Sequence, residues 1–458
     1  MPPLVALLLC ATVVLGLLWI ETRGTHHVSR AQWIPTLWML VTASKPLAYW
    51  FGVKGSNESG SLLDRLFLSG LALCGMWVLA RRRFDWISAL RDRLQLLVLV
   101  SYMCISTLWS DIPTVALKRW GREVVVLIVT MVITSEPSPS QALTALLRRT
   151  AYVLLPFSLV LIKYYPDVGR DYGRWSGIEM WTGVTGQKNE LGRLCMVSIF
   201  FISWVLYHRG RGRLEPAGRY LLWADGFIVV LAGYLLWGSN SVTSLATLIV
   251  GVAMYAAMQW LRSVKLRAPG KALSAAVLVL IAYGTSVPFL GGSDVAQFTS
   301  LLGRDTTLTG RTEVWADVLP AREQRPILGY GFGSFWTDAR RELYDIPTAH
   351  NGYLDILLEL GEVGLMLYCA WLLSCAKQLH RVLSSDYEWA SVAICLLLMS
   401  LLYNVTESAL NSLTDYITAM VVCVSFALPG HSRSRVASDA IRAGRDSNHI
   451  NWQTARNL

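Results

Sequence analysis

Charged residues are scarce in this sequence. Asp, Glu, Lys and Arg make up only 16% of its 458 residues, and 53% are hydrophobic. A soluble globular protein contains about 25% charged residues. The apolar residues also gather in blocks of about 17–23, which is the length that crosses a bilayer. The composition therefore excludes a soluble enzyme, a disulfide-rich secreted domain and a disordered chain, and it indicates a membrane protein.

Two kinds of short motif are also missing. None of the eight cysteines forms a CxxC pair, so the sequence indicates neither a zinc site nor a redox motif. It contains no GxxxxGK[ST] phosphate-binding loop, which argues against an ATP-driven pump. The net charge is +10, but the basic residues form short clusters between apolar blocks. Such clusters indicate membrane topology and not a nucleic-acid interface.

Thirteen apolar segments have the length and composition of membrane spans. We therefore predict an all-α polytopic membrane protein with about 12–13 transmembrane helices. In this interpretation residues 1–430 form one membrane-embedded domain, and residues 431–458 form a polar cytoplasmic tail. The expected spans are 4–20, 33–53, 62–80, 94–110, 114–134, 144–164, 190–208, 219–237, 240–261, 272–291, 353–375, 387–404 and 412–429.

Basic loops predict the orientation of these spans, because Lys and Arg collect on the cytoplasmic side. If the N-terminus lies outside, all five basic clusters fall on the cytoplasmic side. The first segment lacks a basic start and a small-residue cleavage site, so we expect a retained helix and not a signal peptide. The five basic clusters lie at 81–93, 209–219, 262–271, 377–381 and 433–445.

Two long loops then face outward, at 165–187 and at 292–352. The second is a large periplasmic loop in this topology, and loops of such length usually carry function. It is predicted to be partly helical. Thr309 can cap a helix that begins near Arg311 and buries Trp315 on its apolar face.

His350 is the only histidine that this topology places outside, at the start of the helix after the large loop. A histidine there can cap the helix or act as a general base at the membrane surface. Asp355, Glu359 and Glu362 follow on one helical face. They can orient His350 or form a polar packing seam, and the sequence does not decide between these roles.

Charged residues also occur inside the predicted span 114–134. Lys118 and Arg122 share one face, and Arg119 can pair with Glu123 on the next. Each charge in hydrocarbon costs at least about 2.5 kcal/mol, so these residues should face the bundle or a wet cavity. A structural ion pair with Glu123 explains the charge of Arg119 inside the span, whereas the deeper Arg122 has no obvious partner in the sequence.

A further group of polar residues opens the span 190–208, where Lys188, Asn189 and Arg193 offer donors at a helix N-terminus. Anchoring at the interface is the alternative role for Lys188. The alternating glycines at 329–333 do not match a dinucleotide-binding fingerprint and predict a flexible turn. Cations on several outer segments, beside one outward histidine, suit a lipid-linked diphosphate.

Three segments resemble the signature of the bacterial O-antigen ligase and O-antigen polymerase superfamily. They are 311–315 (RTEVW), 326–335 (PILGYGFGSF) and 349–361, which contains AHNGYL and ELG. The stretch 181–189 (WTGVTGQKN) is similar to the exopolysaccharide-polymerase-like branch. The resemblance covers roughly residues 175–365, and the remainder matches in its hydropathy pattern alone.

This resemblance implies a GT-C-like membrane glycosyltransferase in the bacterial inner membrane, with its active site facing the periplasm and with no metal or other cofactor. The donor is an oligosaccharide on undecaprenyl pyrophosphate. The resemblance implies Arg311 and His350 as catalytic residues, with His350 as the base and Arg311 neutralising the leaving pyrophosphate. A further family arginine corresponds to Arg174, Arg119 or Arg122. The remaining expected substrate-binding residues are Lys188, Asn189, Arg193 and Asn351.

The predicted function is polymerisation of exopolysaccharide or O-antigen repeat units. The first alternative is an O-antigen ligase that moves the glycan to the lipid A–core of lipopolysaccharide. A lipid-glycan transporter and a non-catalytic assembly scaffold are the others. Expected partners are the lipid-linked donor, a glycan or lipid A–core acceptor, membrane lipids and a chain-length regulator, but no nucleic acid.

Overall fold

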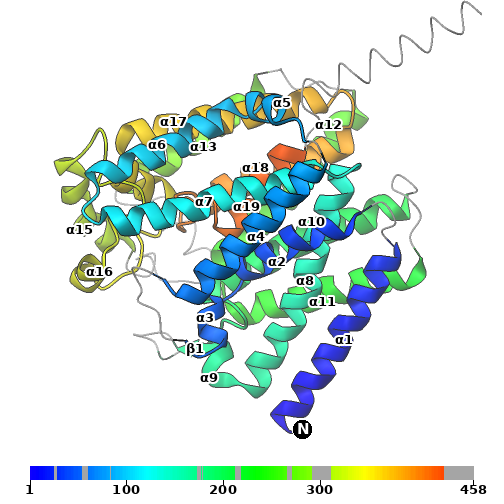
Figure 1. Cartoon of the computed structure of the whole chain (residues 1–458). Coiled ribbons are helices and arrows are strands. Elements are labelled where there is room, and N and C mark those ends of the chain that lie inside the picture. The colour runs from blue at the N-terminus through cyan, green and yellow to red at the C-terminus, as the bar shows by residue number, and fades with distance from the viewer. Residues whose placement is uncertain are drawn as a thin grey trace, which may run out of the picture.

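The computed structural model describes residues 1–24, 28–53, 60–82, 84–172, 177, 179–211, 218–265, 271–290 and 311–427. This part of the chain is mostly helical (Figure 1). Its only strands are β1 (Arg170–Tyr172) and β2 (Glu179–Trp181), which pair antiparallel in the loop after the sixth predicted span. The predicted all-α membrane fold is confirmed.

Helices lie at all thirteen predicted spans. Seven are long and apolar enough to cross a membrane, as judged by length and composition, and they make this a multi-pass membrane protein. These are α1 (Pro3–Gly24), α4 (Leu62–Arg81), α8 (Pro139–Tyr164), α10 (Lys188–Gly210), α11 (Arg219–Ser239), α12 (Val242–Ser263) and α17 (Gly352–Val382).

Four more apolar helices are shorter, and α7 (Pro113–Thr134) is long but carries the four charged residues noted above. The shorter ones are α6 (Leu94–Ser106) with η2 (Thr107–Trp109), α13 (Ala272–Ser286), α18 (Tyr387–Tyr403) and α19 (Tyr416–Ala427). The remaining short helices are η1 (Arg30–Gln32), α2 (Trp33–Thr42), α3 (Leu47–Trp50), α5 (Trp86–Arg91), α9 (Pro166–Gly169), α15 (Arg311–Gln324) and α16 (Asp338–Tyr344).

Two predicted spans need correction. The segment 33–53 is not one helix, because α2 ends at Thr42 and only the single turn α3 follows. Pro46 explains the break, since proline disfavours a helical conformation in the residue before it. The last span was expected to begin at 412, but α19 begins at Tyr416, which leaves Asp415 in the preceding loop.

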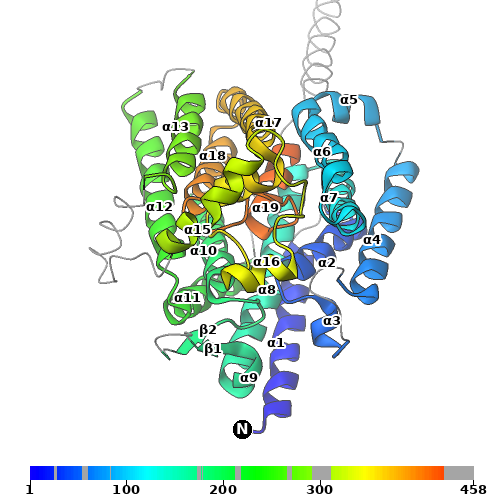
Figure 2. The ribbon, with the colours of Figure 1, turned by 90° about the vertical axis from the view of Figure 1, so that its left-hand side faces the viewer.

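The helices are arranged around a buried centre. Helices α8 and α10 are mostly buried, whereas α1, α4 and α12 expose apolar side chains of the kind that lipid covers. Helices α15 and α16 lie together at the left-hand end of the bundle in Figure 1. Figure 2 faces that end and shows the β1–β2 hairpin below them. We call this the loop end of the bundle.

Buried ion pairs tie the N-terminal helix and α11 to α8. Arg148 makes two 2.8 Å hydrogen bonds to Asp225, which also accepts a 2.6 Å bond from the Tyr152 hydroxyl. Next to it, Arg149 pairs with Glu21 at 2.7 Å. The carboxylates are fully buried, so each charge depends on its partner.

Helix α17 is broken near its start by Gly361, whose φ of 65° and ψ of −164° are not helical. The backbone of 326–331 fills the break, with the Gly331 amide 2.7 Å from the Glu359 carbonyl oxygen and the Glu362 amide 2.9 Å from that of Pro326. A Cβ on Gly361 would lie 2.2 Å from the Ile327 carbonyl oxygen, so only glycine fits.

This arrangement corrects two predictions. The glycine-rich segment 329–333 is a turn, but it is buried and held by hydrogen bonds, and it is not a free flexible loop. Glu362 does not share a face with Asp355 and Glu359, because the break at Gly361 rotates it away. It pairs instead with Arg322 at 2.7 Å, and its side chain is half exposed.

Candidate functional site

Helix α15 carries Arg311 at its first residue, as the sequence predicts. The predicted capping residue Thr309 lies outside the described residues. Trp315, one turn later, is fully buried and donates a 2.9 Å hydrogen bond from its indole Nε1 to the Ala349 carbonyl oxygen. This bond fixes the start of α15 beside the turn that contains His350.

His350 occupies a left-handed turn with a φ of 50°, which is uncommon for a residue with a side chain. Both neighbours hold this conformation. The Ala349 amide donates to Asp355 at 3.2 Å. Asn351 caps α17 through the Leu354 amide at 2.8 Å, and its Nδ2 donates to backbone oxygens of two other segments. A non-glycine residue held in this region is typical of a functional site.

The connection between α18 and α19 packs directly against this turn. The Gly352 amide lies 3.0 Å from the carbonyl oxygens of both Asn404 and Glu407. A Cβ on Gly352 would lie 2.2 Å from Asn404 Oδ1, so this close approach requires glycine. Asn404 in turn accepts hydrogen bonds from the amides of Ala409 and Leu410. The turn that carries Glu407 is therefore fixed from both sides.

Glu407 is the residue on which the predicted site converges. Its Oε1 accepts hydrogen bonds from the Arg311 guanidinium and, at 2.6 Å, from Asn189 Nδ2. Its Oε2 lies 3.6 Å from Nδ1 of His350. Three side chains that the sequence predicts as site residues thus meet on one carboxylate. Arg311, His350 and Glu407 expose 13%, 23% and 4% of their side chains, so the cluster is largely shielded from water.

The environment of Glu407 keeps its carboxylate charged. Burial raises its pKa, but Arg311 and the nearby His350 outweigh this effect and hold the pKa below its ordinary value. The negative charge is therefore retained at neutral pH. It is available to balance Arg311 and to stabilise a protonated His350.

Asn189 connects this cluster to the start of α10. Its Oδ1 accepts a 2.9 Å hydrogen bond from the Ser241 hydroxyl, and its carbonyl oxygen accepts a 3.0 Å bond from the Tyr403 hydroxyl. These bonds orient the Asn189 amide so that Nδ2 points at Glu407. Lys188, the first residue of α10, is half-buried beside it.

The open question about the acidic residues after His350 is answered by their contacts. Asp355 holds the His350 turn, because its Oδ1 accepts both the Ala349 amide and the Trp336 indole Nε1. Glu359 accepts the Gly333 amide at 3.1 Å and so holds the glycine-rich turn. Asp355 therefore orients His350 through the backbone, and Glu359 belongs to packing.

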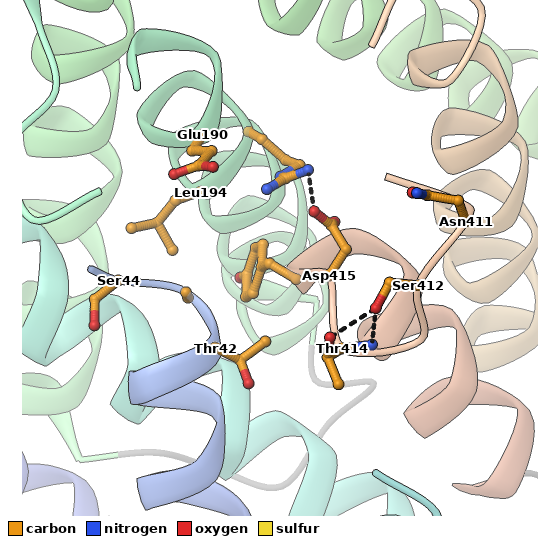
Figure 3. Close-up of a pocket in the computed structure, with 11 residues that line it drawn as sticks. Thr42, Ser44, Glu190, Leu194, Asn411, Ser412, Thr414 and Asp415 are labelled. Carbon is orange, nitrogen blue, oxygen red and sulfur yellow. Dashed lines mark hydrogen bonds and ion pairs between the residues drawn. The ribbon is translucent and has the colours of Figure 1, made fainter. Parts of the chain in front are cut away.

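Arg193 lies one turn beyond Asn189 on α10, and it pairs with Asp415 at 2.8 Å. Both residues line a pocket between α10, the end of α2 and the loop before α19, and Figure 3 shows Asp415 in it. The cavity volume is about 260 Å³. Burial raises the pKa of Asp415 to about 6, although Arg193 opposes this rise.

Three predicted cations remain, namely Arg119, Arg122 and Arg174. Arg119 donates to the Gly333 carbonyl oxygen of the glycine-rich turn. Arg122, next to the buried Glu123, is exposed. Glu123 accepts hydrogen bonds from the Ser412 hydroxyl and the Leu413 amide. Arg174 lies outside the described residues.

Comparison with known proteins bears on this site directly. Residues 227–369 match the model of the O-antigen ligase family. The predicted resemblance to the O-antigen ligase and polymerase superfamily is confirmed. The chain is also similar to the exopolysaccharide production protein ExoQ of Rhizobium meliloti (strain 1021). The two are 26% identical over 305 residues, which cover 64% of this chain and 67% of that protein.

These findings support a membrane enzyme of the O-antigen ligase and polymerase type. The O-antigen ligase match contains Arg311 and His350, whereas Asn189 and Glu407 lie outside it. In the structure, Asn189 from before the matched segment contacts Glu407 from after it, and Arg311 and His350 from within it lie at the same carboxylate.

Sequence reasoning missed Glu407 and Asp415. Glu407 lies in the connection after the span 387–404, which the predicted topology places on the same side as His350, and Asp415 lies near the start of the predicted span 412–429. One carboxylate in an outward loop and another just inside the next span, on the same side as several unexplained cations, form a signal that could have found them. Each one does meet an arginine that the sequence had singled out.

Proposed function

We propose that this protein is a membrane glycosyltransferase that polymerises repeat units of an exopolysaccharide or O-antigen, taken from undecaprenyl pyrophosphate at the outer leaflet of the bacterial inner membrane. One observation carries the proposal. Arg311, a cation suited to a departing pyrophosphate, and His350, a base, meet on the carboxylate of Glu407 at the loop end of the bundle.

The reaction needs one proton transfer and one displacement. His350 takes the proton of an acceptor sugar hydroxyl, and the oxygen attacks the anomeric carbon of the donor. The bond from that carbon to the pyrophosphate oxygen breaks, and the leaving group takes the electron pair. Attack opposite the leaving group inverts the anomeric centre.

Glu407 assigns the two nitrogens of His350 to different tasks. Because Nδ1 faces the carboxylate at 3.6 Å, Nε2 is the nitrogen that receives the acceptor proton. The negative charge then stabilises the imidazolium ion that forms, as a carboxylate does in a catalytic triad. Glu407 is a positioning residue in this scheme, because it acts through His350.

Arg311 can bind the leaving pyrophosphate while it stays bonded to Glu407. A guanidinium group has five N–H donors, and the bond to Glu407 is made by one terminal nitrogen. The remaining donors can bind pyrophosphate oxygens, where positive charge stabilises the negative charge that develops. We assign supporting roles in binding the lipid diphosphate to Lys188 and Arg122, which the proposal places at the same leaflet.

A ligase that transfers the finished glycan to lipid A–core is the second candidate. The name of the matching family model, O-antigen ligase, favours it, whereas the name of the ExoQ relative favours exopolysaccharide production. The two activities share the same bond chemistry and differ in the acceptor. The residues around Glu407 serve either one.

Surface glycans in a deletion strain test this proposal. The strain is complemented with wild type, His350→Ala, Arg311→Ala and two controls, His380→Ala at the far end of α17 and Arg341→Ala in α16. The first two variants should abolish activity at normal protein abundance, and the controls should not. Loss of long chains with single repeats retained indicates a polymerase, and accumulated lipid-linked polymer indicates a ligase. Wild-type glycans in His350→Ala would overturn the proposed function.

A further inference from the structure

The pocket beside Arg193 is separate from the Glu407 cluster but connected to it through α10. Its wall is formed by Thr42 and Ser44 at the end of α2, by Glu190 and Arg193 of α10, and by Thr414 and Asp415 before α19 (Figure 3). Asn189, which bonds Glu407, and Arg193 are four residues apart, which is about 6 Å along a helix. A ligand in the pocket therefore lies next to the proposed reaction centre.

The charges in this pocket do not suit pyrophosphate. Arg193 is the one cation in the wall, and Asp415 already balances it at 2.8 Å. Glu190 adds a second negative charge. Lys45, which follows Ser44, turns its ammonium group to the Val168 carbonyl oxygen at 2.5 Å. The wall therefore has more negative than positive charge, which differs from the anion-binding role that the sequence suggested for Arg193.

The polar atoms of the wall instead match a ligand with hydroxyl groups. Nε of Arg193 is buried and has no hydrogen-bond partner among the described residues, so it has a donor to offer. The carboxylates of Glu190 and Asp415 offer acceptors, and the hydroxyl groups of Thr42 and Ser44 can donate and accept hydrogen bonds. A sugar ring carries hydroxyls that donate and accept in turn. Pockets for drug-sized ligands have volumes of about 300–1,000 Å³, so 260 Å³ suits a single ring.

We propose that this pocket binds one uncharged terminal sugar ring of the acceptor glycan through its hydroxyl groups. The acceptor suits it better than the donor, because the donor sugar is joined directly to the pyrophosphate, whose charge the carboxylates repel. The acceptor's terminal ring carries no such group, and the pocket holds it beside His350. The assignment of donor and acceptor rests on the proposed function, but binding to the pocket is measured without turnover.

The test uses the full-length protein in detergent and two probes. One probe is the repeat-unit oligosaccharide released from the host's own surface polysaccharide, and the other is inorganic pyrophosphate. Glu190→Gln removes one charge with little change in shape, and Thr42→Val removes one hydroxyl. Thr22→Val is the matched control, since Thr22 lies on exposed α1 and bonds its own helix. Thermal unfolding verifies that each variant is folded.

We expect Glu190→Gln and Thr42→Val each to weaken oligosaccharide binding about tenfold, which is typical of one lost hydrogen bond to a charged or polar group. Pyrophosphate binding should not weaken in either variant, and the control should match wild type. Unchanged oligosaccharide binding in both variants, or competition between pyrophosphate and the oligosaccharide, would overturn the proposal.

His350→Ala separates this inference from the proposed function. It should bind the oligosaccharide normally and fail to transfer it. If it transfers sugar, the proposed function fails while the pocket assignment stands. If it is inactive but the pocket variants bind normally, the pocket assignment fails alone.

Discussion

Nδ1 of His350 lies 3.6 Å from Oε2 of Glu407, and the other oxygen of the same carboxylate bonds Arg311. One buried negative charge therefore contacts two residues from separate parts of the large loop. This relationship makes Glu407 as informative a target as either of its partners.

Glu407→Gln should lower the rate of glycan transfer by about 10²-fold, because the amide keeps the shape but loses the charge that stabilises a protonated His350. Since the pKa of Glu407 is held below 4.5, the wild type should keep this contribution throughout the neutral range and lose it only in more acidic solution. The measurement is extension of lipid-linked repeat units across pH. Glu323→Gln, on the exposed part of α15, is the control, and equal rates for both variants would remove Glu407 from the mechanism.

Gly352→Ala should destabilise the protein by about 1–3 kcal/mol, because its Cβ would lie 2.2 Å from Asn404 Oδ1 and the turn carrying Glu407 would have to move. The rate of glycan transfer should also fall, because Glu407 moves with the turn. The control is Gly226→Ala on α11, where a Cβ meets no atom within 4 Å. Thermal unfolding in detergent should show a lower midpoint for the first variant and an equal or higher midpoint for the second.

Asp415 should make stability depend on pH. Burial raises its pKa from 3.8 to about 6, so the folded chain binds this proton more tightly than the unfolded chain. The resulting stabilisation is complete below about pH 3.8 and is lost as the pH rises through about 6. Relative to Asp415→Asn, the wild type should therefore lose stability between pH 4 and 6. A difference that stays constant over this range, as expected for the exposed Asp338→Asn control, would contradict the assignment.

The Arg148–Asp225 pair gives a prediction about the scaffold. Asp225→Asn should destabilise the protein by about 3–5 kcal/mol, because it leaves the buried Arg148 without a counter-charge. Removing both charges, with Arg148→Met and Asp225→Leu, should destabilise the protein less than Asp225→Asn does. Glu362→Gln, which breaks the half-exposed pair with Arg322, should change stability by less than about 1 kcal/mol. Unfolding midpoints of the three variants provide the comparison.

Local patterns in the sequence predict most of the helices and the end of the large loop before α17. Apolar run length and capping chemistry act over a few residues, so they predict the helix that begins near Arg311. They make His350 a candidate cap of α17, whereas the structure gives that role to Asn351. The same kind of pattern fails at α2, where the apolar run continues but Pro46 follows the end of the helix.

The contacts within the site depend on packing between distant segments, which local patterns do not report. Glu407 is one acidic residue in a short loop, and it gains its role only when α10, α15 and α17 deliver Asn189, Arg311 and His350 to it. The break at Gly361 is hidden for the same reason. Its backbone conformation is set by the segment 326–331, which fills the gap.

Under the proposed function, that break also sets the depth in the membrane at which the reaction takes place. The part of α17 after Gly361 is about 31 Å long, close to the roughly 30 Å thickness of the hydrocarbon layer. If the second part crosses the hydrocarbon layer, as the proposed function requires, the first segment, about 14 Å long and buried in protein, extends beyond that layer. His350 sits at its start. In this proposal, the diphosphate of a membrane lipid and a sugar arriving from water meet at that level, and neither has to leave its own medium.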